Sequence, residues 1–186
     1  MERFYRIIDS TTFRNRWHLG APCDQNGAEI DPRVFTMAQR YAGSEPVNIT
    51  VKQGGCPLDF TLGSFDMPVL RAWVGRAILE SAAKEIQLIK ASVDGDDDFV
   101  VLNVLSNLDA IDEARSEITR WTEDDGRPEK VGTYFGIASI AIRTDKVKGA
   151  KMFRLREWEL PLIVTDSIKS TLQKLKVTGI DFEELK

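Results

Sequence analysis

The stretch that decides the fold is DMPVLRAWVGRAILESAAKEIQLIKASVDGDDDFVVLNVL, residues 66–105. In its first part, apolar side chains recur at three- and four-residue spacing, at Leu70, Trp73, Val74, Ala77 and Ile78. This spacing predicts a helix with one buried stripe, in which Trp73 belongs to the core. Asp66 can cap this helix, and Pro68 suits its first turn.

Two strand patterns follow the helix. Glu85–Val93 alternates apolar and polar positions, which predicts a strand. Phe99–Leu105 is nearly all apolar, as is typical of a strand covered on both faces. The acidic run 94–98 between them spaces its carboxylates as a calcium loop does, but Phe99 and Leu105 stand where an EF-hand needs glycine and glutamate. We therefore expect a strand-connecting turn.

A second helix–strand unit lies near the end of the chain. Thr165 is a suitable N-cap, and Gly179 ends the helix before the alternating segment 180–183, which predicts an edge strand. The spacing of apolar residues echoes the first unit, with Val74, Ile78 and Ile86 matched by Ile168, Leu172 and Ile180. The echo favours two weakly related lobes, about 1–93 and 94–186, within a single domain of 186 residues.

Further strands are expected from composition and alternation, at Phe4–Ile8, Val47–Val51, Thr133–Arg143 and Lys151–Arg156. Short strands separated by glycine and proline, together with only two main helices, favour an α+β fold. Its sheets should be mostly antiparallel.

Bulk composition indicates a soluble cytoplasmic protein. Hydrophobic residues make up 42% of the chain and charged residues 29%, which is ordinary for a globular domain. Neither a signal-peptide core nor an apolar run of membrane-spanning length is present, so no membrane association is expected. The two cysteines, Cys23 and Cys56, are expected to be reduced.

The sequence gives little support for several kinds of catalytic or ligand-binding site. His18 is the single histidine, which disfavours a catalytic triad and most transition-metal sites. No phosphate-binding glycine motif occurs, and we expect neither a cofactor, nor a metal, nor catalytic residues. An isoelectric point near 5.2 and the lack of basic runs disfavour direct binding of nucleic acid.

Negative charge is concentrated between Asp94 and Asp125. This segment holds eleven acidic residues and only two basic ones, Arg115 and Arg120, so it carries −9 while the whole chain carries −4. Two interpretations stay open: acidic loops without a shared role, or a face that meets a basic partner. The candidate partner-binding residues are Asp94, Asp96, Asp97, Asp98, Asp112, Glu113, Glu117, Trp121, Glu123, Asp124 and Asp125.

The chain resembles the immunity-protein family numbered eleven of bacterial polymorphic toxin systems, formerly a domain of unknown function. The most specific piece is residues 109–132, and others are 17–22, 31–35, 58–60, 102–104, 152–154, 162–165 and 177–182. The resemblance implies a non-enzymatic protein that binds and neutralises a cognate toxin delivered by contact-dependent or type VI secretion. It further implies that this toxin is often a nuclease, so a nuclease domain is the expected partner.

Two other functions remain as alternatives. The protein could be an adaptor or chaperone that escorts a secreted effector without blocking it. It could also be a metal-dependent enzyme that uses its clustered carboxylates. An acidic face suits the inhibitor best, because an acidic patch can occupy the cationic cleft in which a nuclease holds phosphates.

Overall fold

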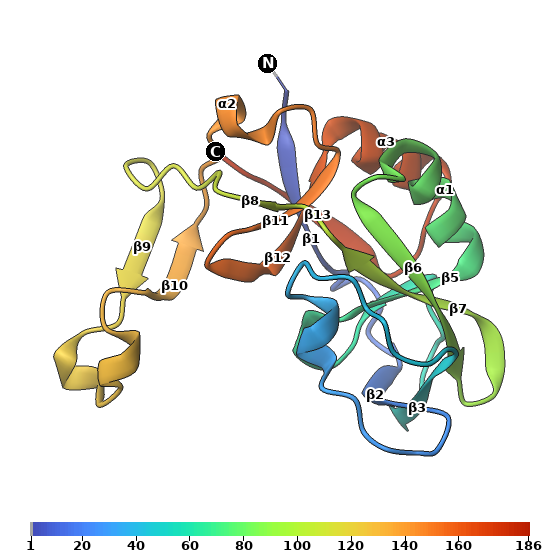
Figure 1. Ribbon diagram of the computed structural model, residues 1–186. Helices are drawn as coiled ribbons and strands as arrows, with labels where there is room; N and C mark the ends of the chain where they lie inside the picture. Colours follow the sequence, from blue (N-terminus) through green and yellow to red (C-terminus); the bar gives the residue numbers. More distant parts are fainter. Residues whose placement is uncertain (1) are drawn as a thin grey trace.

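The computed structural model describes residues 2–186, and within them the chain forms two sheets, a two-stranded arm and three α-helices (Figure 1). The five-stranded sheet has the order β13-β1-β12-β11-β8, from β1 (Phe4–Asp9), β8 (Asn107–Leu108), β11 (Met152–Leu155), β12 (Trp158–Thr165) and β13 (Ile180–Glu184). The six-stranded sheet has the order β2-β3-β6-β7-β5-β4, from β2 (His18–Cys23), β3 (Val47–Gln53), β4 (Phe60–Leu62), β5 (Pro68–Arg71), β6 (Ile86–Val93) and β7 (Asp96–Val104).

The arm consists of β9 (Glu117–Arg120) and β10 (Tyr134–Ser139). The helices are α1 (Ala72–Ala82), α2 (Thr144–Val147) and α3 (Asp166–Lys174), and the short 3₁₀ turns are η1 (Pro32–Phe35), η2 (Ser64–Asp66), η3 (Glu123–Asp125) and η4 (Pro128–Lys130). Among the described strands, the parallel neighbours are β3 with β6 and β11 with β8, and the other pairs are antiparallel. The predicted α+β fold with mostly antiparallel sheets is confirmed.

The two helix–strand units have the same topology. β5 leads directly into α1 and then β6, and both strands pair antiparallel with β7, which lies between them. β12 leads directly into α3 and then β13, and both strands pair antiparallel with β1. The spacing echo in the sequence therefore corresponds to two units of one kind. The strand between the two outer strands is β7, the next strand along the chain, in the first unit, and β1, from the start of the chain, in the second. The division into two lobes near residue 93 stays a prediction.

One apolar cluster, which we call the shared core, joins both sheets and both long helices. All six residues of the spacing echo belong to it, as do Tyr5 and Ile7 of β1 and Phe60 of β4. β7 sends Val100, Leu102 and Val104 into it. The shared core thus makes the two sheets one packed body.

The face of each sheet that points away from the shared core is covered by a separate apolar cluster. Phe99 and Val101 of β7 point into a second cluster, which Phe35 of η1 closes over the six-stranded sheet. This confirms that β7 is buried on both faces. On the five-stranded sheet, Phe153 and Ile163 enter a third cluster.

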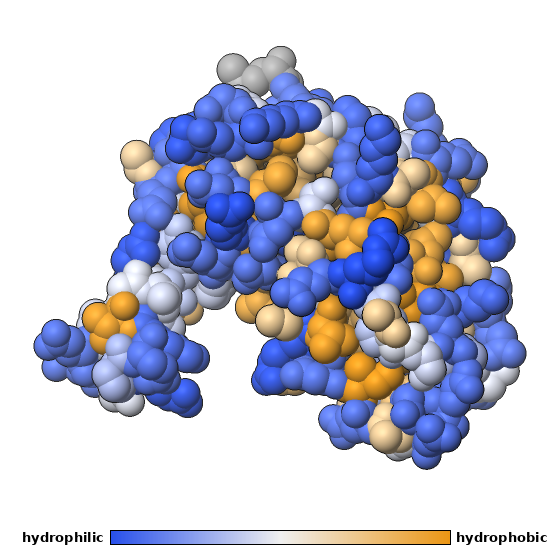
Figure 2. Space-filling model, viewed as in Figure 1, coloured by the Kyte–Doolittle hydropathy of each residue, from blue (hydrophilic) through white to orange (hydrophobic). Residues whose placement is uncertain are grey.

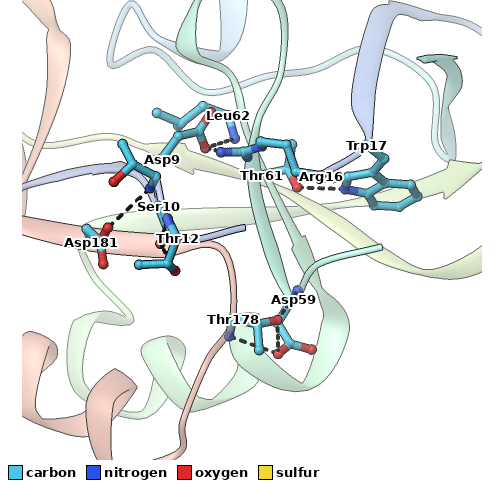
Figure 3. A network of polar contacts seen from close by, with 11 residues as sticks. Asp9, Ser10, Thr12, Arg16, Trp17, Asp59, Thr61, Leu62, Thr178 and Asp181 are labelled. Carbon is cyan, nitrogen blue, oxygen red and sulfur yellow. Dashed lines mark hydrogen bonds and ion pairs between the residues drawn. The ribbon is translucent and has the colours of Figure 1, made fainter. Parts of the chain in front are cut away.

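A seam of polar contacts ties the ends of the two sheets together (Figure 3). The Asp59 carboxylate accepts hydrogen bonds from the backbone N–H and the hydroxyl of Thr178, at 3.0 and 2.7 Å, although these residues stand 119 positions apart. Asp9 accepts from Leu62 N at 3.0 Å and from the Arg16 guanidinium at 2.8 Å. Gly179 has φ +93°, and a Cβ there would collide with the carbonyl oxygen of Phe60, so only glycine allows this close approach.

Two details of the predicted first helix are wrong. Asp66 and Pro68 do not begin it: Asp66 has φ 54°, and Pro68 opens strand β5, so α1 begins at Ala72. Pairing with β4 and β7 outweighs the helical spacing of this segment. Trp73 is half-buried, packed against the edge of the shared core instead of inside it.

Other boundaries agree with the sequence. α3 begins after Thr165, and β13 is an edge strand, as predicted. Asp94 and Gly95 both have positive φ, 48° and 87°, which is the conformation of a two-residue hairpin turn and confirms the turn between β6 and β7. Of the helices within residues 2–186, none has the length and apolar character needed to cross a membrane.

Neighbouring positions on α1 provide a matched test of the shared core. Ile78 is 1% exposed and Leu79 is 38% exposed. We expect Ile78→Ala to lower the free energy of unfolding by about 2–5 kcal/mol, because it leaves a cavity between the sheets. Leu79→Ala should cost about 0.5 kcal/mol or less. Urea denaturation followed by tryptophan fluorescence measures both, and equal costs would contradict the proposed position of the core.

Candidate partner interface

The structure places the candidate acidic residues in two separate regions. Asp94, Asp96, Asp97 and Asp98 lie at the turn of the β6–β7 hairpin. The others, from Asp112 to Asp125, lie on the arm and its base, on the opposite side of the molecule in Figure 1. The acidic segment of the sequence is therefore divided between two surfaces, and its role in partner binding stays a prediction.

At the β6–β7 hairpin, the carboxylates take part in local structure. The Arg71 guanidinium lies 2.7 Å from Asp96 and 3.9 Å from Asp98, and stacks 4.1 Å above the Phe99 ring. The backbone N–H of Asp98, followed by Arg71, holds the pKa of Asp96 below its usual range. Asp94 accepts a hydrogen bond from Val51 N at 3.1 Å. Much of the charge here stabilises the turn.

The arm projects away from the body and is fixed only at its base (Figure 1). Ile118 and Ile137 pack against the third cluster, which covers the five-stranded sheet. The Ser116 hydroxyl accepts from Ala141 N at 2.9 Å, which ties the two sides of the base. A two-stranded hairpin by itself is marginally stable in water, so this packing is what holds the arm in place.

A polar triad joins the base of the arm to the outer end of its two strands, where Arg120 pairs with Tyr134. Glu113 accepts from the Arg120 guanidinium and from the Tyr134 hydroxyl, both at 2.7 Å. Arg120 also stacks 4.7 Å above the Tyr134 ring. Burial, together with the hydrogen bond to Glu113, raises the pKa of Tyr134 to about 12. Glu113 therefore stabilises the structure of the arm and also contributes to its negative charge.

The tip of the arm presents an aromatic pair ringed by charge. The Trp121 and Phe135 rings meet edge to face, with centroids 4.7 Å apart, and Phe135 is 52% exposed. Beside them, η3 is closed by reciprocal hydrogen bonds between Thr122 and Asp125, which lower the pKa of Asp125. Figure 2 shows a small apolar spot on the arm surrounded by hydrophilic surface.

Two carboxylates at the tip, Glu123 and Asp124, form no ion pair with any of residues 2–186. Both are exposed, in contrast to the partly neutralised pair Asp96 and Asp98. Glu117 pairs with Lys186 at 3.3 Å, and Asp112 with Arg115 at 3.9 Å. Six acidic residues of the segment form no ion pair within residues 2–186, and three of them lie at the tip of the arm: Asp94, Asp97, Asp109, Glu123, Asp124 and Asp125.

The sequence did not indicate the exposed apolar residues of the arm. Val131 and Phe135 were not among the candidates, since Phe135 lies in a strand pattern typical of buried positions. Their exposure follows from the lack of a third strand or a cover beside β9 and β10 in the described chain. The available signal was their position within ten residues after the end of the acidic segment.

The described residues 2–186 contain no group of three or more His, Cys, Asp or Glu side chains that could hold a metal ion. The acidic side chains point outward from two separate hairpins. The geometry thus presents exposed carboxylates beside an aromatic pair.

Such an arrangement defines a protein with an exposed surface suited to binding a partner. The sequence matches the model of the immunity protein family (Imm11) over residues 82–186, and the chain belongs to this family. The matched part contains both acidic regions and the whole arm. A search of functionally curated proteins found no match.

The triad of Glu113, Arg120 and Tyr134 can be tested by titration. We expect Glu113→Gln to lower the pKa of Tyr134 from about 12 towards its ordinary value, because the neutral amide no longer disfavours the phenolate. Ultraviolet absorption of tyrosinate, followed against pH, measures the shift. Tyr134→Phe identifies which transition belongs to this residue. An unchanged transition in Glu113→Gln would show that the hydrogen bond does not form.

Proposed function

We propose that this protein binds a cognate nuclease toxin and blocks its activity, with the tip of the arm as the principal contact. Membership of an immunity protein family supports the neutralising role. The observation that carries the choice of surface is the pair formed by the half-buried Trp121 and the exposed Phe135, close in sequence to the unpaired carboxylates of Glu123 and Asp124. The proposed activity is inhibition by binding, without catalysis.

The chemistry of the tip matches the surface of a nuclease. An enzyme that cleaves nucleic acid presents cationic groups to the phosphates of its substrate, and Glu123, Asp124 and Asp125 can face those groups in the substrate's place. Complementary charge also raises association rates, up to about 10⁸–10⁹ M⁻¹s⁻¹ at low salt. Rapid capture suits protection against a catalytic poison.

Steering alone does not give a long-lived complex. A nanomolar dissociation constant corresponds to about −12 kcal/mol, and most of such energy comes from a few desolvated aromatic or arginine side chains. Trp121 and Phe135 are the aromatic side chains at this tip. Lys130, 4.9 Å from the Trp121 ring, helps to fix the orientation of that ring. The tip therefore combines a steering charge with an anchor.

Charge reversal at the tip tests the steering role. We expect Glu123→Lys with Asp124→Lys to slow association with the toxin about tenfold at low salt and to weaken its salt dependence. The control is Glu80→Lys with Glu184→Lys, which changes the net charge equally at exposed sites outside the arm. Stopped-flow fluorescence measures both rates. Equal slowing in the two variants would mean that net charge matters and the tip does not.

Truncation of the aromatic pair tests the anchor. We expect Phe135→Ala to raise the dissociation constant at least about tenfold, as loss of an interface hot spot does. Leu175→Ala is the control, because Leu175 is similarly exposed, at 44%, on the loop after α3. Calorimetry with the catalytically inactive toxin of the neighbouring gene gives the affinities. Growth of cells that co-express active toxin shows whether binding protects them; cells that die despite binding would indicate an adaptor.

A further inference from the structure

A second exposed apolar surface lies on the body, outside the arm. Met37, Phe65 and Leu160 account for three of the seven large hydrophobic side chains exposed within residues 2–186. They line one pocket of about 250 Å³ together with Arg33 and Trp158. We call these five residues the Phe65 patch. Contiguous exposed apolar surface rimmed by polar groups is typical of an interaction site.

The backbone around the Phe65 patch is strained. Phe65 has φ 53°, Asp66 54°, Glu157 67° and Ala38 54°, so four of the seven non-glycine residues with positive φ in the described chain lie in or beside this pocket. Each such conformation costs about 1–2 kcal/mol for a residue with a side chain. Strain of this kind gathers at binding sites, where it holds side chains in a working position. In this pocket the strained backbone keeps the Phe65 ring exposed to solvent.

The pocket is also held rigid from beneath. The Arg154 side chain is fully buried and donates from Nη1 to the carbonyl oxygens of Glu159 and Leu160, at 2.7 and 2.9 Å. Burial lowers the pKa of Arg154 to about 10, so it remains charged at neutral pH. On the outer side, the Arg33 guanidinium lies 4.2 Å above the Phe65 ring. A preformed surface loses little entropy when a partner binds.

The Phe65 patch borders the open side of the molecule that faces the arm. Figure 2 shows a wide hollow between the arm and the lower part of the body. In Figure 1, the turn between β11 and β12 and the blue segment after β2, which includes η1, lie along the body side of this hollow. Both segments supply pocket residues. A partner that occupies the hollow could therefore reach the arm and the Phe65 patch together.

The charge of the pocket indicates what kind of partner fits. Glu157 and Glu159 line it, whereas its one lining cation, Arg33, is already shared between Asp31, at 3.3 Å, and the Phe65 ring. The arm tip across the hollow carries Glu123 and Asp124. Both sides thus offer apolar groups beside carboxylates. They suit a partner segment in which a lysine or arginine adjoins an aliphatic or aromatic side chain.

We propose that the Phe65 patch is a second contact surface for the same toxin, which would lie in the hollow with a basic and apolar segment seated on Phe65, Met37 and Leu160. This inference rests on the proposed function. A standard interface buries about 800 Å² on each partner, around 20–30 residues a side. The tip of the arm, residues 121–135, has only 15 residues, and the patch provides additional surface.

The test uses the full-length protein and the catalytically inactive toxin of the neighbouring gene. Phe65→Gly removes the ring and also relieves the positive φ, so it should not fail to fold. Leu160→Ala is the second variant. We expect each to raise the dissociation constant at least about fivefold through faster dissociation, with the salt dependence of association unchanged. Leu175→Ala again serves as the control.

The outcomes separate the two proposals. If Phe65→Gly and Leu160→Ala bind as the unaltered protein does, while Phe135→Ala binds weakly, the patch is not a toxin contact and the proposed function stands. If the unaltered protein binds no toxin, the proposed function fails and the patch inference fails with it. Sedimentation gives a third outcome: a dimer that Phe65→Gly dissociates would assign the patch to self-association and overturn the inference.

Discussion

The architecture depends on one constraint: two twisted sheets share a single apolar core, and two helices close it. α1 and α3 each bury one stripe there, and neither sheet can bury its inner face without the other. In each unit two parallel strands flank a central antiparallel strand. This central strand is β7, the next strand along the chain, in the first unit, and β1, from the start of the chain, in the second. The seam at Gly179 and Thr178 then sets how closely the sheet ends approach.

Because the shared core buries the inner faces of both sheets, their outer faces can pack against other elements. The five-stranded sheet buries its outer face under the base of the arm and α2, through Phe153, Ile163 and Val147. Stability is therefore concentrated at the base, and the tip contributes little to folding. Exposed aromatic side chains and unpaired carboxylates can be placed there without weakening the protein, which is what a contact surface requires.

The acidic side chains likewise divide into those that stabilise the fold and those that face solvent. On the β6–β7 hairpin, Arg71 offsets two carboxylates and fixes the turn. On the arm, Arg120 and Tyr134 bind Glu113, whereas Glu123 and Asp124 at the tip face solvent. A continuous acidic run in sequence thus yields structural carboxylates in some places and free ones in others. The strained Phe65 patch adds an apolar surface that combines Arg33, Met37 and Phe65, which lie before the family match, with Trp158 and Leu160, which lie within it.

The sequence by itself determined the type of most elements and the family, since periods of two and 3.6 residues and cap residues are local properties; β6, β7, α3 and the edge strand β13 follow from them. Only the tertiary structure decided that Pro68 opens a strand, that Trp73 lies at the edge of the core, and that the acidic segment divides. It alone showed that the side chains of Phe135 and Phe65 are exposed to solvent. The physical reason is that strand neighbours and solvent exposure depend on residues far apart in the chain, which no local pattern encodes.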